Sequence, residues 1–178
     1  MLHGSRGGHP ANMSADPHPG VHPDVRWPAG WGPESCDEFV SHERRMAAPA
    51  DVVFDHLIAV ERWPAWQHGV SRTELVDEIA VGGRFTVLAA PHAFDGIVGE
   101  LEPPRRFGWA GVSDGLSFYQ SWLLLDEPGG GTRTVFHEAA RGPSALRSST
   151  GRAATTRCWV DALPPTDIPG APVTFPVI

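Results

Sequence analysis

The sequence contains no lysine, so all 14 of its basic residues are arginines, set against 21 acidic residues. The formal net charge of -7 at pH 7 argues against a nucleic-acid partner, because phosphate binding requires clustered positive charge. The arginines of Arg44-Arg45 and Arg105-Arg106 form only isolated pairs, which is typical of a solvated surface. We therefore expect no nucleic acid among the partners of this protein.

Cysteine and long apolar runs are also scarce. The two cysteines, Cys36 and Cys158, are far apart and lack the spacing of metal ligands. They leave room for one disulfide but not for a disulfide scaffold, so a reducing compartment is expected. No apolar run approaches the length of a membrane span, and the N-terminus lacks the apolar segment of a signal peptide. We expect a soluble, cytoplasmic protein without a membrane partner.

Several catalytic and cofactor motifs are missing. The chain has no Gly-x-Gly-x-x-Gly, no phosphate loop, no His-Glu-x-x-His and no Gly-x-Ser-x-Gly. The run Gly129-Gly130-Gly131 lies between two strand-like segments, where it indicates a hairpin turn. We therefore expect neither a cofactor nor a metal.

Residues 1–34 are rich in glycine, proline and histidine and show neither helical nor strand periodicity, which predicts a disordered tail. Four of the nine histidines lie in this segment, but their irregular spacing does not favour a metal site. Trp27 and Trp31 are the exception, because indole rings are costly to leave in water. Their presence favours packing of this short stretch back onto the domain.

Residues 35–143 carry the pattern of one α+β domain. The segment CDEFVSHERRM alternates as a first strand, and Pro49 marks the first turn of a helix. Val53, Leu57 and Val60 form an apolar stripe on that helix. Six strand-like segments separated by glycine-rich and proline-rich turns follow, which predicts a curved antiparallel sheet with helices on one face.

Four motifs in this order resemble the START/Bet v 1-like (SRPBCC) superfamily, specifically its bacterial polyketide cyclase/dehydrase branch. They are AAPADVVFDHLIAVERWPAWQHGV, VGGRF, ELEPPRRFGWAG and SFYQSWLLLDEPGGGTRTVFHEAARGP. The resemblance implies a helix-grip fold, in which a seven-stranded antiparallel sheet curls around a long C-terminal helix. It also implies two short helices after the first strand and an apolar tunnel between the sheet and the long helix.

Residues 144–178 depart from that family pattern. They contain several prolines, many small residues and no apolar stripe, so we expect a poorly ordered segment with the long helix degraded or absent. One explanation is a shifted reading frame, which would make the chain a non-functional product. The other is that Trp159, Val160 and Leu163 form a short substitute plug over the sheet.

Alternation in LSFYQSWLLL sorts the side chains of this strand into two faces, and we expect the face with the large aromatic residues to point inward. An apolar, aromatic lining suits a flat hydrophobic ligand, although a simple core would produce the same pattern. Trp63 and Trp66 in particular suit a purely structural role at the helix end. The predicted ligand-binding residues are Phe54, Trp63, Trp66, Phe85, Val87, Trp109, Phe118, Gln120 and Trp122.

Few groups offer acid–base chemistry. His137 and Glu138 are adjacent on the last strand, so at most one of them faces the cavity. A cyclase needs a positioned acid–base group and an oxyanion partner, roles that His137 and Arg84 would fill. Asp95 is a further candidate. The alternative is that all three are surface or hydrogen-bonded sheet residues.

The resemblance implies binding of a small aromatic, polyketide-like or lipid-like molecule. We expect the protein to be a monomer or weak homodimer. A polyketide cyclase or dehydratase acting in the same cavity is the alternative, because this scaffold hosts both carriers and enzymes. The sequence does not decide between them.

Overall fold

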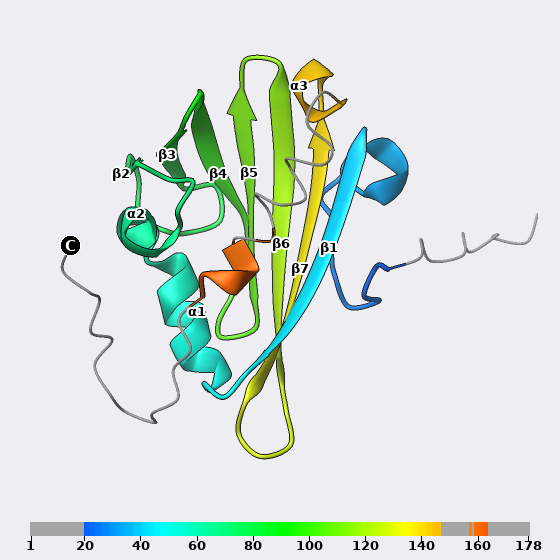
Figure 1. Cartoon of the computed structure of the whole chain (residues 1–178), viewed down its shortest axis with the longest axis vertical. Coiled ribbons are helices and arrows are strands. Elements are labelled where there is room, and N and C mark those ends of the chain that lie inside the picture. The colour runs from blue at the N-terminus through cyan, green and yellow to red at the C-terminus, as the bar shows by residue number, and fades with distance from the viewer. Residues whose placement is uncertain (1–19, 147–156, 158, 164–178) are drawn as a thin grey trace, which may run out of the picture.

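The computed structural model describes residues 20–146, 157 and 159–163. Its centre is a strongly curved antiparallel sheet of seven strands in the order β1-β7-β6-β5-β4-β3-β2 (Figure 1). The strands are β1 (Glu38–Met46), β2 (Arg72–Leu75), β3 (Arg84–Ala89), β4 (His92–Glu102), β5 (Arg106–Ser113), β6 (Leu116–Asp126) and β7 (Thr132–Arg141). The helices and 3-10 turns are η1 (Pro33–Ser35), α1 (Ala50–Ile58), η2 (Val60–Arg62), α2 (Trp63–Trp66) and α3 (Pro143–Leu146).

The order of the strands shows how the chain runs through the sheet. Strands β2 to β7 form a meander in which each strand pairs with the next. Strand β1 pairs with β7, from Glu38 opposite Ala140 to Met46 opposite Thr132. The first and last strands therefore lie side by side, and β2 forms the far edge. This arrangement confirms the predicted α+β helix-grip architecture, with its two short helices after the first strand.

Helix α1 begins where the sequence predicts it, after Pro49 in an extended conformation. Its apolar residues Val53, Phe54 and Leu57 are buried against the inner face of the sheet. Nε1–H of Trp63 donates a 2.9 Å hydrogen bond to the carbonyl oxygen of Leu57, close to the C-terminal end of α1. This bond satisfies a helix-end carbonyl and fixes α2 against α1.

The inner face of the sheet carries the largest aromatic side chains. Glycines on neighbouring strands make room for their rings: a Cβ atom on Gly96 would lie 2.6 Å from the ring of Phe85. Gly111 lies under the ring of Phe118 in the same way. Close packing of this kind gives one compact core between the sheet, α1 and α2.

The outer face of the sheet is covered by the N-terminal segment. Val25 and Trp27 pack on Leu123 and Val135, which point away from the inner core. The described part of the predicted tail, residues 20–34, is therefore packed on the sheet, whereas residues 1–19 lie outside the described part of the chain. The physical reason is that a seven-stranded sheet with an apolar second face needs a cover on that side too.

The C-terminal segment is also partly packed. No long C-terminal helix is present among the described residues, as the sequence predicts, but a short helical turn crosses the concave face near α1 (orange in Figure 1). Trp159, Val160 and Leu163 of this turn belong to the hydrophobic core. Nη1 of Arg44 donates to the carbonyl oxygens of Val160, Asp161 and Leu163 at 2.8 to 3.0 Å. The placement of these residues matches the substitute-plug interpretation.

Three further observations concern the described residues alone. None of their helices is long and apolar enough to cross a membrane. They contain no group of three or more histidine, cysteine, aspartate or glutamate side chains that is able to hold a metal ion. Cys36 is a free thiol whose Sγ donates to the carbonyl oxygen of Pro33 at 3.3 Å, and Cys158 lies outside the described part of the chain.

Candidate ligand-binding cavity

A cavity of about 330 Å³ lies on the concave face of the sheet, between the α2–β2 connection, the β3–β4 hairpin and the turn that carries Trp159. Its wall is mostly apolar and aromatic, with a few polar side chains. It is lined by Gln67, Gly69, Val70, Val87, Ala89, Ala90, Pro91, His92, Phe94, Trp109, Leu116, Phe118, Gln120, Glu138, Ser144 and Trp159.

Trp159 links the cavity to the core. Its ring centroid lies 5.0 Å from that of Trp63 and 5.7 Å from that of Trp66, both in edge-to-face geometry. It also lies 6.4 Å from Trp109 and 6.5 Å from Trp122. Aromatic rings at these distances and angles attract one another through their quadrupoles. The helical turn is therefore held to the sheet by an aromatic cluster, and one side of Trp159 remains in the cavity wall.

A chain of hydrogen bonds crosses the floor of the cavity. Nε1–H of Trp109 donates to Oε1 of Gln120 at 3.0 Å, and Nε2–H of Gln120 donates to Oε2 of Glu138 at 2.7 Å. The three residues are 1%, 2% and 2% exposed. They lie on β5, β6 and β7, with Trp109 opposite Gln120 and Gln120 opposite Glu138 in the register. The sheet geometry alone therefore brings a buried carboxylate to the cavity.

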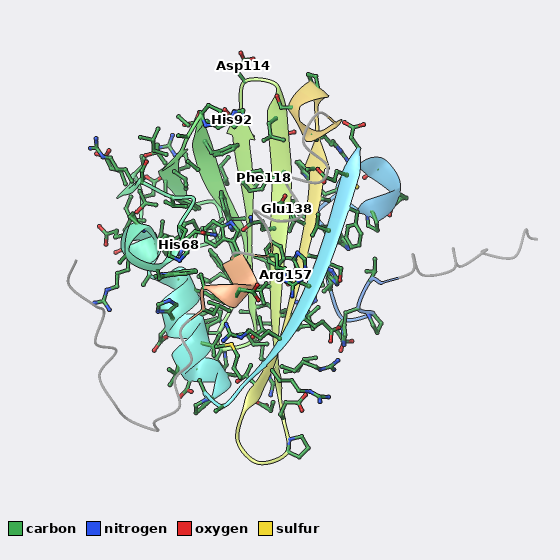
Figure 2. The ribbon with its side chains drawn as sticks, in the orientation of Figure 1. His68, His92, Asp114, Phe118, Glu138 and Arg157 are labelled. Carbon is green, nitrogen blue, oxygen red and sulfur yellow. The ribbon has the colours of Figure 1, made fainter. Side chains whose placement is uncertain are left out.

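Two more polar side chains line the cavity away from this chain. Oε1 of Gln67 accepts a 3.1 Å hydrogen bond from the backbone N–H of Gly69, and its Nε2 is buried without an acceptor among the described residues. His92 is half-buried, with its ring centroid 5.5 Å from that of Phe94. Figure 2 shows Phe118 and Glu138 together over the middle of the sheet and His92 higher, on β4.

The predicted ligand-binding residues divide into two groups. Val87, Trp109, Phe118 and Gln120 line the cavity. The other five are buried in the core without lining it, because the two short helices and the Trp159 turn cover that part of the inner face. These core residues are Phe54, Trp63, Trp66, Phe85 and Trp122.

His137, the predicted acid–base residue, lies on the opposite face of the sheet from the cavity. It is fully buried, and its Nε2 accepts a 3.1 Å hydrogen bond from the backbone N–H of His22. The rings of Phe39 and Trp27 cover it, with centroids 5.4 and 6.3 Å away. Burial, with smaller effects from His22 and His42, lowers the pKa of His137 to about 4. The alternation of β7 separates it from the cavity that Glu138 enters.

Arg84 and Asp95 do not line the cavity either. Arg84 is exposed, and its Nε donates a 2.8 Å hydrogen bond to Oδ2 of Asp77. This hydrogen bond is the main cause that lowers the pKa of the Asp77 carboxyl. Asp95 is exposed on β4, where its neighbours Phe94 and Gly96 take the inward positions. The structure therefore brings none of the three predicted catalytic residues together.

The cavity contains residues that were not among the predicted site residues. Glu138 shares the inward parity of Phe136 on β7, and the position of this aromatic residue is the signal in the sequence that favoured Glu138 over His137. Gln67 directly follows the second tryptophan of the WPAW element, but no pattern in the sequence marks the direction of its side chain. Trp159 was predicted only as a member of the substitute plug and not as a residue of the cavity wall.

Comparisons with known proteins agree with the observed fold. The family model described as "Polyketide cyclase / dehydrase and lipid transport" matches residues 39–161. No curated protein matches the chain in sequence. Among solved structures, a hypothetical protein from Helicobacter pylori matches with a TM-score of 0.73 and 21% identity, covering 80% of this chain and 95% of that chain.

Two further solved structures have a similar fold. A START superfamily protein from Mycobacterium smegmatis has a TM-score of 0.59 and 14% identity, covering 70% of this chain and 93% of that chain. A Streptomyces aromatase/cyclase has a TM-score of 0.58 and 16% identity, covering 71% of this chain and 90% of that chain. At these identities the likeness extends to the fold alone.

Proposed function

Because the chain belongs to the polyketide cyclase/dehydrase and lipid transport family, we propose that it binds a small hydrophobic, aromatic molecule in the inner cavity. The observation that carries the proposal is the cavity itself, whose wall combines Trp109, Phe118 and Trp159 with aliphatic side chains. A ligand site is typically a concave, mostly apolar pocket with a small number of polar groups, and its volume is about 300–1,000 Å³. The cavity falls at the lower end of that range.

The shape of the wall favours a flat ligand. The Phe118 ring is edge-on to Trp109 at 4.9 Å, and Trp159 faces the same space from the helical turn. Aromatic rings arranged in this way offer both faces and edges to a planar guest, and burial of its apolar surface supplies the binding free energy. Gln67 and the Gln120–Glu138 pair supply the few polar contacts that orient such a guest.

The experiment is native mass spectrometry of the purified protein, followed by solvent extraction and identification of any bound molecule. A cavity-filling variant, Val87→Phe, is expected to lose the bound species while it keeps the fold, because Val87 is buried in the cavity wall. Val112→Phe is the matched control, since Val112 is 49% exposed on β5 outside the cavity. Equal loads of ligand in both variants would count against this cavity as the site.

A second candidate function is a cyclase or dehydratase acting in the same cavity, and the observation that favours it is the buried carboxylate of Glu138. General acid–base catalysis requires a titratable group within hydrogen-bond reach of the substrate. In this reaction Glu138 takes the role that the sequence suggested for His137. Incubation with a stabilised poly-β-ketone substrate analogue tests it: Glu138→Gln should abolish turnover and His137→Gln should not. Wild-type protein without turnover would leave binding as the function.

A further inference from the structure

We propose that protonation of His137 releases residues 22–27 from the outer face of the sheet, so that this segment is an acid-sensitive cover of the aromatic cluster beneath it. The proposal is independent of ligand binding, because the cavity lies on the opposite face. Its foundation is the 3.1 Å hydrogen bond from the backbone N–H of His22 to Nε2 of His137. This bond joins a segment outside the sheet to the middle of β7.

The hydrogen bond determines where the imidazole of His137 carries its proton. Because Nε2 accepts from a backbone N–H, the proton of the neutral ring is on Nδ1. Nδ1 is buried and has no hydrogen-bond partner among the described residues. A second proton can therefore enter only at Nε2, where it faces the N–H of His22 as one donor facing another. Protonation thus breaks the bond and leaves a buried cation without an acceptor.

The segment yields more easily than the strand. His137 lies opposite Ser41 of β1 and Ser121 of β6, so β7 is paired on both sides at this point. Residues 22–27 lie in no helix or strand, and their displacement breaks no hydrogen bond of the sheet. The charged imidazole therefore reaches water when the segment moves away and the Trp27 ring uncovers it.

The release should end at Gly30, because acid does not affect the contacts of the residues that follow. Nε of Arg141 donates to the carbonyl oxygen of Ser35 at 2.6 Å, and its guanidinium group lies 4.6 Å from the ring centroid of Trp31. Neither a carbonyl group nor an indole titrates between pH 4 and pH 7. Gly30 has a φ of 81°, and a glycine permits the backbone rotation that release of one part requires.

The titratable side chains around His137 do not stabilise its charged form. Burial lowers the pKa of His137 to about 4, with smaller effects from His22 on the segment and His42 on β1. Glu43, diagonal to it on the outer face of β1, lies 3.5 Å from Nη1 of an arginine, Arg133. On β6, burial raises the pKa of Tyr119, so this phenol is neutral in mild acid.

Two other contacts of the segment oppose its release. Nη1 of Arg106 donates to the carbonyl oxygen of Asp24, a bond that does not depend on pH in this range. Glu100, 3.5 Å from Nη1 of Arg26, has a pKa that burial raises, so its protonation favours the docked segment. Variants at His137 separate its effect from these two.

The test is amide hydrogen exchange of the full-length chain, followed by NMR at pH 7 and pH 5. Protection factors remove the direct effect of pH on the exchange chemistry. With a pKa of about 4 when docked and 6.5 when released, the protection of the His22 amide should fall on the order of tenfold. The amides of Leu123 and Val135 in the sheet should lose less. If they lose protection by the same factor, the whole domain opens and the proposal is wrong.

Two variants identify the titrating group. Glutamine offers an acceptor oxygen but takes up no proton in this range, so His137→Gln should remove the fall in protection at the amide of His22. His22→Ala is the matched control, because it keeps the backbone N–H and removes the neighbouring imidazole. It should retain the fall. An undiminished fall in His137→Gln, or its loss in His22→Ala, overturns the assignment to His137.

A further measurement needs no substitution. The nitrogen chemical shifts of the His137 imidazole, recorded at pH 7, distinguish its two neutral forms. We expect the proton on Nδ1, since Nε2 accepts from His22. A proton on Nε2 would exclude that hydrogen bond and with it the proposed mechanism of release. This result stands even if glutamine at position 137 fits the site poorly.

Discussion

Nη1 of Arg44 donates a 2.8 Å hydrogen bond to the carbonyl oxygen of Leu163, although 119 residues separate the two in the chain. The same nitrogen lies 2.9 Å from the carbonyl oxygen of Val160. Carbonyl groups at the C-terminal end of a helix have no partner within the helix, so a guanidinium group there is a favourable cap. A residue of β1 thus holds the turn that covers the cavity.

Substitution of Arg44 by alanine should therefore release the C-terminal turn. We expect a loss of about 2 kcal/mol in the free energy of unfolding, the usual value for hydrogen bonds to a charged donor. We also expect faster proteolysis after Arg157, which is exposed on the turn. Urea denaturation and limited trypsin digestion measure the two effects.

Arg45→Ala is the matched control for that experiment, because Arg45 is the next residue and points to solvent. Its ion pair with Glu127 spans 3.5 Å at a side chain that is 79% exposed, so its removal should change stability by less than about 1 kcal/mol. If both variants lose the same stability, the cap on the turn is not the cause.

Trp159 should matter for both stability and ligand binding. Trp159→Ala removes the ring that contacts Trp63 and Trp66, and truncation of a buried tryptophan typically costs about 3–5 kcal/mol. Trp159→Phe keeps an aromatic ring and is expected to fold with a smaller loss. Both variants should bind 2-methoxynaphthalene more weakly than the wild type, in the order alanine weaker than phenylalanine. Unchanged affinity in both would remove Trp159 from the binding wall.

The stability of the domain should fall in mild acid because of two buried histidines. Burial lowers the pKa of His137 and of His56 to about 4 in the folded protein, and Arg62 adds a smaller effect at His56. In the unfolded chain each histidine titrates near its ordinary pKa of 6.5. Between these two values the unfolded state binds more protons, so protonation favours unfolding.

The contribution of the two unprotonated histidines to the free energy of unfolding is fully present above pH 6.5. It is lost as the pH falls toward 4. Urea midpoints at pH 7 and pH 5 measure the loss. His137→Gln cannot be protonated in this range, so its midpoint should fall less between the two pH values than the wild-type midpoint. A variant with the same pH dependence as the wild type would show that His137 does not carry the effect.

Trp27 should protect His137 from water. The Trp27 ring packs against Phe39 and Tyr119 at 6.1 Å and against His137 at 6.3 Å on the outer face of the sheet. Because Trp27 is only half-buried, Trp27→Ala should cost about 2 kcal/mol, less than a fully buried tryptophan. The exposed imidazole should regain a pKa closer to its ordinary value.

Histidine proton resonances followed by NMR titration measure that pKa directly. The control is Val81→Ala, since Val81 is 66% exposed and its truncation should change stability by less than about 0.5 kcal/mol. If the pKa of His137 stays near 4 in Trp27→Ala, the sheet alone shields the imidazole from water.

Much of the fold was predictable from the sequence because its signals are local. Pro49 and the stripe of Val53 and Leu57 determine where α1 begins and which side it buries. Alternation along β6 correctly divides Phe118 and Trp122 from the residues of the outer face. These signals depend only on backbone geometry and side-chain size, so they can be read without knowledge of the neighbours.

The candidate site was less predictable because it depends on which strands and turns meet. Alternation places His137 and Glu138 on opposite faces, but only the full sheet shows that the N-terminal segment covers one face and the cavity occupies the other. Trp63 and Phe85 point inward as expected, yet the short helices and the Trp159 turn fill the space above them. Whether an inward side chain lines a cavity or is packed in the core depends on the elements that lie opposite it.

The sequence by itself therefore determined the α+β sheet, its inner face and the two short helices, since hydrophobic periodicity and turn residues act over a few positions. Tertiary structure alone decided that Glu138 meets Gln120, that Arg44 caps the turn of Trp159, and that Trp27 covers His137. These contacts join residues from distant parts of the chain. Their geometry follows from strand register and from the demand that both apolar faces of the sheet be covered, and no local pattern encodes either.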